Sequence, residues 1–173
     1  MADTNSRVWV NCPACGAPLR LGPGGASLTC EYCRSLYFPE KNEDGVQVLG
    51  ESPGEACPVC AVPLMEASLE QTRMRYCTRC RGMLIPMDSL AGLIDAVRSG
   101  PARSSSSHPA GAEELERRLA CPHCHEAMES YFYAGPGHVV IAGCERCLLN
   151  WLDAGELEQI AHAPDPLRDA LVE

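Results

Sequence analysis

Twelve cysteines carry most of the chemistry available to this 173-residue chain. They form six C-x-x-C pairs with none left over, at positions 12/15, 30/33, 57/60, 77/80, 121/124 and 144/147. Two residues between cysteines let one tight turn present both sulfurs to a single ion, and a second pair completes a tetrahedron. Taken two pairs at a time, the inner cysteines have 14, 16 and 19 residues between them. Zinc sites with four cysteines typically have roughly 15–20 residues there, so the first unit is only slightly short.

We therefore predict three Zn²⁺ ions, each in a structural site of four thiolates, and no catalytic residue. The predicted ligands are Cys12, Cys15, Cys30 and Cys33; Cys57, Cys60, Cys77 and Cys80; and Cys121, Cys124, Cys144 and Cys147. The three units span 22, 24 and 27 residues, well below the roughly 40 residues that usually fold on apolar burial alone. Structural zinc contributes on the order of 10–16 kcal/mol, so metal can replace the missing core. Without metal these units should be largely unfolded.

Two other uses of the cysteines stay open. Iron in a rubredoxin-like site would make an electron carrier, and redox-active pairs would make a thiol oxidoreductase. Zinc is favoured because a redox pair usually stands alone in a thioredoxin-like α/β domain, and no such pattern surrounds these pairs. Four protein ligands also leave no position for a water molecule, so we expect no hydrolytic enzyme.

The elements that position the cysteines recur three times, which makes the units repeats. Each opens Cys-Pro-x-Cys and places an apolar residue four positions after the second cysteine: Leu19, Leu64 and Met128. Each also has large apolar residues four and five positions after the last cysteine: Tyr37 and Phe38, Leu84 and Ile85, Trp151 and Leu152. The pattern predicts three small metal-stabilised domains of the zinc-ribbon class, each a β-hairpin with two C-x-x-C knuckles that share one internal packing scheme.

Helical patterns follow the second and third units. Asp88 or Ser89 can cap a helix whose apolar stripe is Leu90, Leu93, Ile94 and Val97, and Gly100-Pro101 ends it. Asp153 can cap a second helix with Glu156 at its third position, Leu157, Ile160 and Ala161 on one face, and Pro164 after its end. We expect the first stripe to pack on its own hairpin or to serve as a docking face. Residues 113 to 120 and 166 to 172 are further short helical candidates.

The predicted domain boundaries follow the cysteine repeats and the helix ends. Ribbon one covers residues 7–38, ribbon two with its helix 57–98, and ribbon three with flanking helices 113–173. Residues 39–56 read as a linker, although 46–49 could form a short strand. Residues 99–112 contain four consecutive serines and have the composition of a flexible tether. In the third hairpin we expect strands over 130–133 and 138–141, with a turn between them.

Charge and composition limit the partners and the compartment. The formal charge is −9, and each filled site adds −2 because four thiolates outweigh one Zn²⁺, which brings the total to about −15. An acidic field opposes nonspecific nucleic-acid binding. The start of the sequence lacks the basic and apolar run of a signal peptide, and no apolar stretch is long enough for a membrane span. We therefore expect a cytoplasmic protein that binds neither a membrane nor a small-molecule substrate.

The third unit carries a recognisable signature. Cys121-Pro-His-Cys124, and Cys144-Glu-Arg-Cys147 continuing through Trp151-Leu-Asp-Ala-Gly-Glu-Leu157, resemble the bacterial transcription-factor-IIB-type zinc-finger family. Leu149 stands where that family has glycine, two residues after the last cysteine. The second unit resembles a diverged copy that keeps Gly82 and Leu90, and the first resembles only a generic zinc ribbon. The resemblance covers about half the chain and implies a zinc-ribbon fold, but it does not define a function.

Several other residues are candidates for binding. Arg73, Arg75, Arg79 and Arg81 surround Tyr76 in a basic cluster, which fits either a solvated hairpin surface or contacts to phosphates. We expect Trp151 to pack inside ribbon three, and His123 and His125 to lie on the surface rather than ligate metal. The function predicted from sequence is a scaffold of zinc ribbons that binds another macromolecule, a protein in preference to a nucleic acid. A nucleic-acid-binding or transcription-related regulator that uses the arginines is the alternative.

Overall fold

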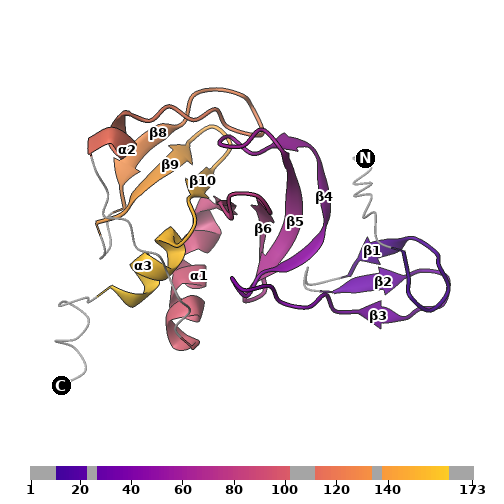
Figure 1. Ribbon diagram of the computed structural model, residues 1–173. Coiled ribbons are helices and arrows are strands. Elements are labelled where there is room, and N and C mark those ends of the chain that lie inside the picture. Colours follow the sequence, from indigo (N-terminus) through magenta and orange to yellow (C-terminus); the bar gives the residue numbers. More distant parts are fainter. Residues whose placement is uncertain (1–10, 23–26, 102–111, 134–137, 164–173) are drawn as a thin grey trace, which may run out of the picture. The chain divides into compact units, whose positions relative to one another are not determined.

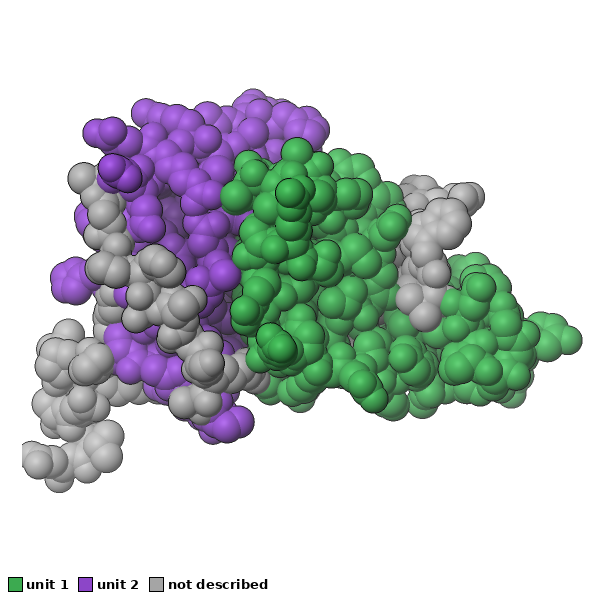
Figure 2. Space-filling view, in the orientation of Figure 1, with its two compact units in different colours: residues 1–83 green, residues 84–173 purple. Residues whose placement is uncertain are grey.

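The computed structural model describes residues 11–22, 27–101, 112–133 and 138–163. The chain divides into two compact units, residues 1–83 and 84–173, coloured green and purple in Figure 2. The first unit holds the first two groups of cysteines, and the second unit holds the third group. This division does not follow the three predicted domains, because the helix expected for ribbon two belongs to the second unit. The predicted domain boundaries stay a prediction.

Ribbon one forms a small antiparallel sheet in the order β1-β2-β3 (Figure 1). Its strands are β1 (Leu19–Leu21), β2 (Leu28–Cys30) and β3 (Leu36–Tyr37). In β2 the side chains alternate, so Leu28 and Cys30 face the interior while Thr29 lies on the other face. The buried core of this ribbon is Cys12, Leu19, Leu28, Cys30 and Leu49.

Ribbon two is an antiparallel meander of β4 (Gln47–Ala56), β5 (Pro63–Leu69) and β6 (Thr72–Tyr76). β5 and β6 are joined at Glu70 and Gln71, which both have positive φ, 45° and 67°. Two such residues between paired strands are the geometry of a type I′ hairpin turn, here without glycine. Along β6, Met74 and Tyr76 are buried while Arg73 and Arg75 lie on the opposite face, as strand alternation predicts.

The segment predicted as a linker, residues 39–56, contains the ten-residue strand β4 instead of only a short strand at 46–49. β4 pairs with β5 along its length, from Gln47 opposite Ser68 to Ala56 opposite Pro63. The register shifts between Glu51 and Ala56, where Gly54 has a φ of +81° that glycine adopts readily. Pro53 and Gly54, which made the segment resemble a linker, lie in this bulge.

The second unit contains α1 (Met87–Ser99), α2 (Ala112–Glu116), β8 (Glu129–Phe132), β9 (Val140–Cys144), β10 (Leu149–Leu152) and α3 (Glu156–His162). The strand β7 (Met83–Pro86) begins one residue before the unit boundary. The ribbon-three sheet is antiparallel with β9 between β10 and β8. All four stripe residues of α1 are buried, and within this unit α1 contacts α3.

Both helix starts differ from the predicted caps. α1 is preceded by Pro86 at its N-cap, and neither Asp88 nor Ser89 caps it, because both already lie inside the first turn. α3 has Gly155 at its N-cap with a φ of 86°. The Asp153 side chain does not cap α3 because tertiary contacts use its carboxylate, but Glu156 still accepts a 2.6 Å hydrogen bond from the Asp153 backbone N–H. That is the returning half of a capping box.

Other expectations fall partly outside the described residues. The predicted turn at 134–137, the tether at 102–111 and the helix at 166–172 lie outside them. The helix expected over 113–120 is shorter in the structure and ends at Glu116. None of the helices in the described part of the chain is long and apolar enough to cross a membrane.

Candidate metal centres

The twelve cysteines converge in three groups of four, and the four sulfurs of each group lie within 4.8 Å of one another. The Sγ to Sγ distances are 3.6 Å for Cys12 and Cys33, 3.6 Å for Cys57 and Cys80, and 3.7 Å for Cys124 and Cys144. A tetrahedron with sulfur about 2.3 Å from its central ion has edges of about 3.8 Å, whereas a disulfide bond is about 2.05 Å long. The groups therefore have the size of tetrathiolate metal sites and not of disulfides.

Each group is built from two knuckles with the same backbone hydrogen bonds. In the first knuckle the Cys12 N–H donates to the Ala17 carbonyl at 2.7 Å, and the Gly16 N–H donates to the Cys12 carbonyl at 2.8 Å. The same pair of bonds recurs at the knuckles that begin at Cys30, Cys57, Cys77 and Cys121. At the sixth knuckle Cys144 pairs with Leu149 in the β9 to β10 ladder. In the folded chain these bonds hold both cysteines of a pair in one tight turn.

The residue after the second cysteine of every knuckle has a left-handed backbone. The φ values are 74° at Gly16, 60° at Arg34, 56° at Ala61, 63° at Arg81, 63° at His125 and 55° at Leu148. Five of these six residues carry a side chain, and left-handed backbone costs roughly 1–2 kcal/mol for such residues. The first knuckles at Ala61 and His125 therefore carry a backbone cost that Gly16 avoids, and the second knuckles share the same conformation.

Backbone N–H groups also point at the sulfurs. The Cys60 N–H donates to Cys57 Sγ at 3.3 Å, and the Cys80 N–H donates to Cys77 Sγ at 3.5 Å. At Cys33, hydrogen bonds from the Ser35 side chain and backbone lower the pKa of the thiol to about 6. Hydrogen bonds to sulfur favour the thiolate, which is the form that ligates metal.

The sites differ in their exposure to solvent. In every group the first cysteine of each pair is buried. In ribbon one the second cysteines, Cys15 and Cys33, are exposed, whereas the second cysteines of the other two ribbons are only partly exposed. The ribbon-one site is thus open to solvent on the side of two of its four sulfurs.

Asp44 connects the predicted linker to ribbon two. Its carboxylate accepts hydrogen bonds from the Tyr76 hydroxyl at 2.6 Å and from Arg81 Nε at 2.8 Å. Burial, and then the hydrogen bond with Asp44, raise the pKa of Tyr76. Arg81 is the left-handed residue of the second knuckle of ribbon two, and Tyr76 ends β6. Their shared contact with Asp44 therefore holds this knuckle close to β6.

The arginine cluster is partly neutralised within the first unit. Arg75 Nε lies 2.9 Å from a Glu55 carboxylate oxygen, and its guanidinium also lies 3.3 Å from Glu66. Arg81 forms an ion pair with Asp44. Arg73 and Arg79 are exposed. Two of the four predicted phosphate contacts are therefore engaged with carboxylates.

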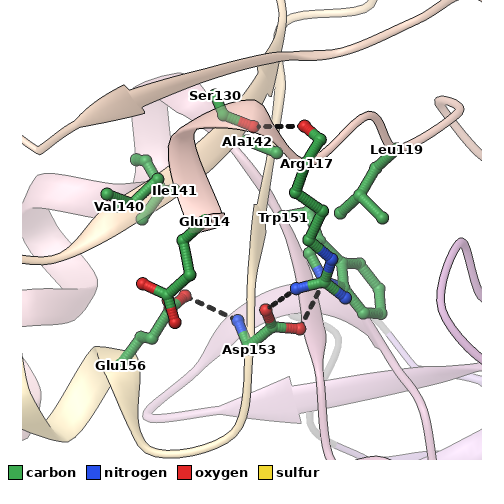
Figure 3. Close-up of a pocket in the computed structure, with 10 residues that line it drawn as sticks. All are labelled: Glu114, Arg117, Leu119, Ser130, Val140, Ile141, Ala142, Trp151, Asp153 and Glu156. Atoms are coloured by element: carbon green, nitrogen blue, oxygen red, sulfur yellow. Dashed lines mark hydrogen bonds and ion pairs between the residues drawn. The ribbon is translucent and has the colours of Figure 1, made fainter. Parts of the chain in front are cut away.

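A polar network joins Arg117, the residue after α2, to the end of ribbon three (Figure 3). The Asp153 carboxylate accepts a hydrogen bond from Trp151 Nε1 at 3.0 Å and forms an ion pair with Arg117. The Arg117 carbonyl in turn accepts a hydrogen bond from the Ser130 hydroxyl at 2.9 Å. As predicted, the Trp151 ring is buried inside ribbon three.

Glu156 lies in the same network. Burial, and after it the negative charges of Asp153 and Glu114, raise the pKa of Glu156 to about 8 against the Asp153 N–H bond, which lowers it. The cavity between these side chains has a volume of only about 10 Å³. That is room for one water molecule and too little for an organic substrate.

The candidates singled out in the sequence have separate places in the fold. The twelve cysteines gather in the three predicted groups, and Leu19, Leu64 and Met128 are buried. His123 and His125 are exposed and stand outside the cysteine group of ribbon three. Sequence reasoning missed Asp44 in the predicted linker and Arg117 in the predicted helix at 113–120, because neither belongs to a motif with recognisable spacing.

Strand-rich modules with paired C-x-x-C knuckles around four converging sulfurs define the zinc-ribbon class of fold. Residues 120–163 match the transcription factor zinc-finger family of the TFIIB zinc-ribbon type. The third ribbon is therefore a zinc ribbon of this type, as its Trp-Leu-Asp-x-Gly-Glu-Leu signature predicted, and the other two groups are four-cysteine sites of the same spacing. Comparisons with curated proteins and with solved structures found no match.

Proposed function

We propose that this chain is a cytoplasmic scaffold whose three ribbons each hold one structural Zn²⁺ and together present surfaces to a protein partner. The observation that carries the proposal is the set of twelve sulfurs in three tetrahedral-sized groups. A ligand set of four thiolates fits zinc and closes its coordination sphere, so the metal stabilises the fold and activates no water. When bound, zinc supplies charge compensation for thiolates that could not otherwise share so small a space.

A protein partner is favoured over a nucleic acid. The chain has a formal charge of −9 before any metal is counted. Arg75 and Arg81, which would contact phosphates, already pair with carboxylates. Phosphate binding would require those ion pairs to be exchanged, and the acidic field would oppose the encounter.

The nucleic-acid alternative keeps one specific observation in its favour, because Arg73 and Arg79 are exposed in ribbon two. A salt series of fluorescence anisotropy with single-stranded and duplex DNA tests it, using the wild-type chain and the R73A/R79A double variant. The scaffold proposal predicts no salt-sensitive binding by either protein. Binding that weakens steeply with salt and is lost in the double variant would establish the alternative instead.

Metal analysis of the purified chain tests the structural role. We expect three equivalents of zinc in a colourless protein, and loss of folded structure when a chelator removes them. Red colour with visible absorbance would indicate iron and an electron carrier. A dithiol that forms a disulfide reversibly while the fold persists would indicate a thiol oxidoreductase.

A further inference from the structure

Asp44 brings a carboxylate from the segment between the first two ribbons onto the second knuckle of ribbon two. Its two oxygens pair with Nε and Nη2 of Arg81, so two parallel hydrogen bonds hold the guanidinium. Such a fork fixes the orientation of an arginine as well as its position. The Tyr76 hydroxyl donates a third bond at 2.6 Å. The Asp44 side chain is only 16 % exposed and Tyr76 is buried, so water competes weakly for these contacts.

The turn that carries Asp44 is itself held in place. The Asn42 side-chain oxygen accepts hydrogen bonds from the backbone N–H of Asp44 at 3.0 Å and from that of Val46 at 2.9 Å. The Gly45 N–H donates to the Asn42 carbonyl at 2.8 Å, and Val46 is fully buried. An asparagine side chain that bonds the backbone two residues further on stabilises a local turn. Asp44 is therefore presented to Arg81 from a fixed support.

Arg81 connects this contact to the metal ligands. It directly follows Cys80, and its backbone N–H donates to the Cys77 carbonyl at 2.8 Å. Its φ of 63° is left-handed, a conformation that is unfavourable for a residue with a side chain. A change of that backbone conformation would reorient Cys80 relative to the other three sulfurs. The fork to Asp44 opposes this movement, because the guanidinium would have to leave its partner.

The same position of the repeat lacks this contact in the other two ribbons. The residue after the last cysteine is Arg34 in ribbon one and Leu148 in ribbon three. Arg34 is exposed and forms no ion pair within the part of the chain that the structure describes. Leu148 has no charge, and its carbonyl accepts a 2.9 Å hydrogen bond from the Met87 N–H instead. Because Arg34 and Arg81 are the same residue type, the carboxylate of Asp44 is what distinguishes ribbon two from ribbon one.

We propose that Asp44 is a positioning residue for the ribbon-two metal site: it keeps the second knuckle closed through Arg81 and slows the loss of Zn²⁺. An exposed ion pair alone contributes little, and the Arg81 side chain is 48 % exposed. The effect comes from orientation, since groups that orient metal ligands typically change metal affinity roughly 10–100-fold. Asp44 acts one residue away from the ligand, so we expect the lower end of this range. The proposal rests on the proposed structural role of zinc and names a residue that controls how long one site keeps its ion.

The test measures zinc release from each ribbon of the full zinc-loaded chain. Excess chelator removes the metal, brief pulses of an alkylating reagent mark the freed thiols, and mass spectrometry assigns the marked peptides to a ribbon. The variants are Asp44→Asn, which keeps the size of the side chain and removes its charge, Arg81→Gln, and the double variant. Arg34→Gln is the matched control, because it removes the same residue type from the same repeat position without breaking a described ion pair.

Asp44→Asn and Arg81→Gln should each release the ribbon-two ion about tenfold faster than wild type, while ribbons one and three keep their wild-type rates. The double variant should be no faster than either single variant, because both substitutions remove one shared contact. Arg34→Gln should leave release from ribbon one within about twofold of wild type. Unchanged release from ribbon two in Asp44→Asn, additive effects in the double variant, or an equal acceleration of ribbon one by Arg34→Gln would each overturn the proposal.

Amide hydrogen exchange separates positioning from a general loss of stability. In the zinc-loaded Asp44→Asn variant, exchange should become faster at the Arg81 N–H, while the amides of β5 should exchange as in wild type. Faster exchange throughout β5 would show a purely structural role and would also overturn the proposal. If Asp44→Asn does not fold, Arg81→Gln gives the same readout from the other partner of the contact.

The outcomes distinguish this proposal from the function on which it rests. A wild-type chain with three equivalents of zinc, together with wild-type release rates in Asp44→Asn, would leave the zinc scaffold standing and exclude only the role of Asp44. A wild-type chain that binds no zinc would remove both.

Discussion

Ribbons one and three hold the same four-cysteine set in different surroundings. In ribbon one, two ligands and the strand after the last knuckle are exposed, and the core has five buried members. In ribbon three, Trp151, Met128 and Ile141 are fully buried beside the site, and helix α3 follows it. The difference shows that one coordination motif can be combined with very unequal amounts of apolar burial. The weaker the core, the larger the share of folding free energy that metal must supply.

Metal removal should reveal this difference with the largest effect, because structural zinc contributes on the order of 10–16 kcal/mol. A chelator titration should release one equivalent of zinc well before the other two, since Cys15 and Cys33 are open to solvent. A zinc-sensitive dye and ribbon-resolved NMR would follow release and unfolding together. Simultaneous loss of all three equivalents, or first loss from ribbon three, would contradict the comparison.

Truncating the matched aromatic residues should separate the two ribbons next. Trp151→Ala leaves a cavity in a buried site and should lower the free energy of unfolding of ribbon three by about 3–5 kcal/mol. Tyr37→Ala removes an exposed side chain at the equivalent repeat position and should change stability by less than about 1 kcal/mol. Denaturant unfolding of the zinc-loaded chain measures both. Equal losses would mean that Tyr37 is covered within the chain itself.

A pH series should detect Glu156, which has no counterpart in ribbon one. Its pKa of about 8 in the folded chain exceeds its usual value, so the folded state holds the proton more tightly than the unfolded state. Stability from this group is therefore complete below the usual pKa and is lost as pH rises through about 8. After allowance for partial exposure, ribbon three should lose roughly 1–3 kcal/mol between about pH 6 and 8.5.

The control for the pH series is Glu156→Gln, which resembles the protonated side chain. In thermal melts with excess zinc, the wild-type chain should lose stability relative to this variant as pH rises through the same range, because the pH dependence of zinc binding is common to both proteins. An unchanged slope in the variant would rule out Glu156 as the titrating group.

Exchanging knuckle residues should have the smallest effect. Ala61→Gly relieves a left-handed alanine and should stabilise ribbon two by roughly 0.5–1 kcal/mol, after the entropy cost of glycine. Gly16→Ala should destabilise ribbon one by a similar amount. Guanidinium midpoints of the two variants provide the comparison. Stability changes of the same sign in the two variants would show that the metal ligands, and not the left-handed backbone, determine the stability of a knuckle.

The sequence predicted the cysteine groups and the helix stripes because each depends on local spacing. Leu90, Leu93, Ile94 and Val97 recur at helical intervals, and all four are buried. β4 was harder to predict, because Pro53 and Gly54 interrupt its alternation to form a bulge that only the pairing with β5 explains. Long-range pairing of this kind leaves no signal in a window of a few residues.

Side-chain roles set by tertiary contacts were also beyond sequence reasoning. Asp153 has the right type and position for a helix cap, yet its carboxylate accepts the Trp151 Nε1–H and pairs with Arg117, 36 residues earlier. Tyr37 and Phe38 match buried positions of the other repeats, and only the structure shows that they are exposed. The periodicity of a repeat predicts which residues are alike, but the neighbours decide which of them are covered.

Leu49 ties the first two ribbons together mechanically. It is part of the buried core of ribbon one, while its strand β4 is paired with β5 of ribbon two. Proteolytic cleavage between residues 39 and 56 would therefore separate Leu49 from the core of ribbon one or separate the edge strand β4 from ribbon two. When a pulling force is applied across the first unit, the two ribbons should unfold in one step, because the segment between them contributes to the structure of both.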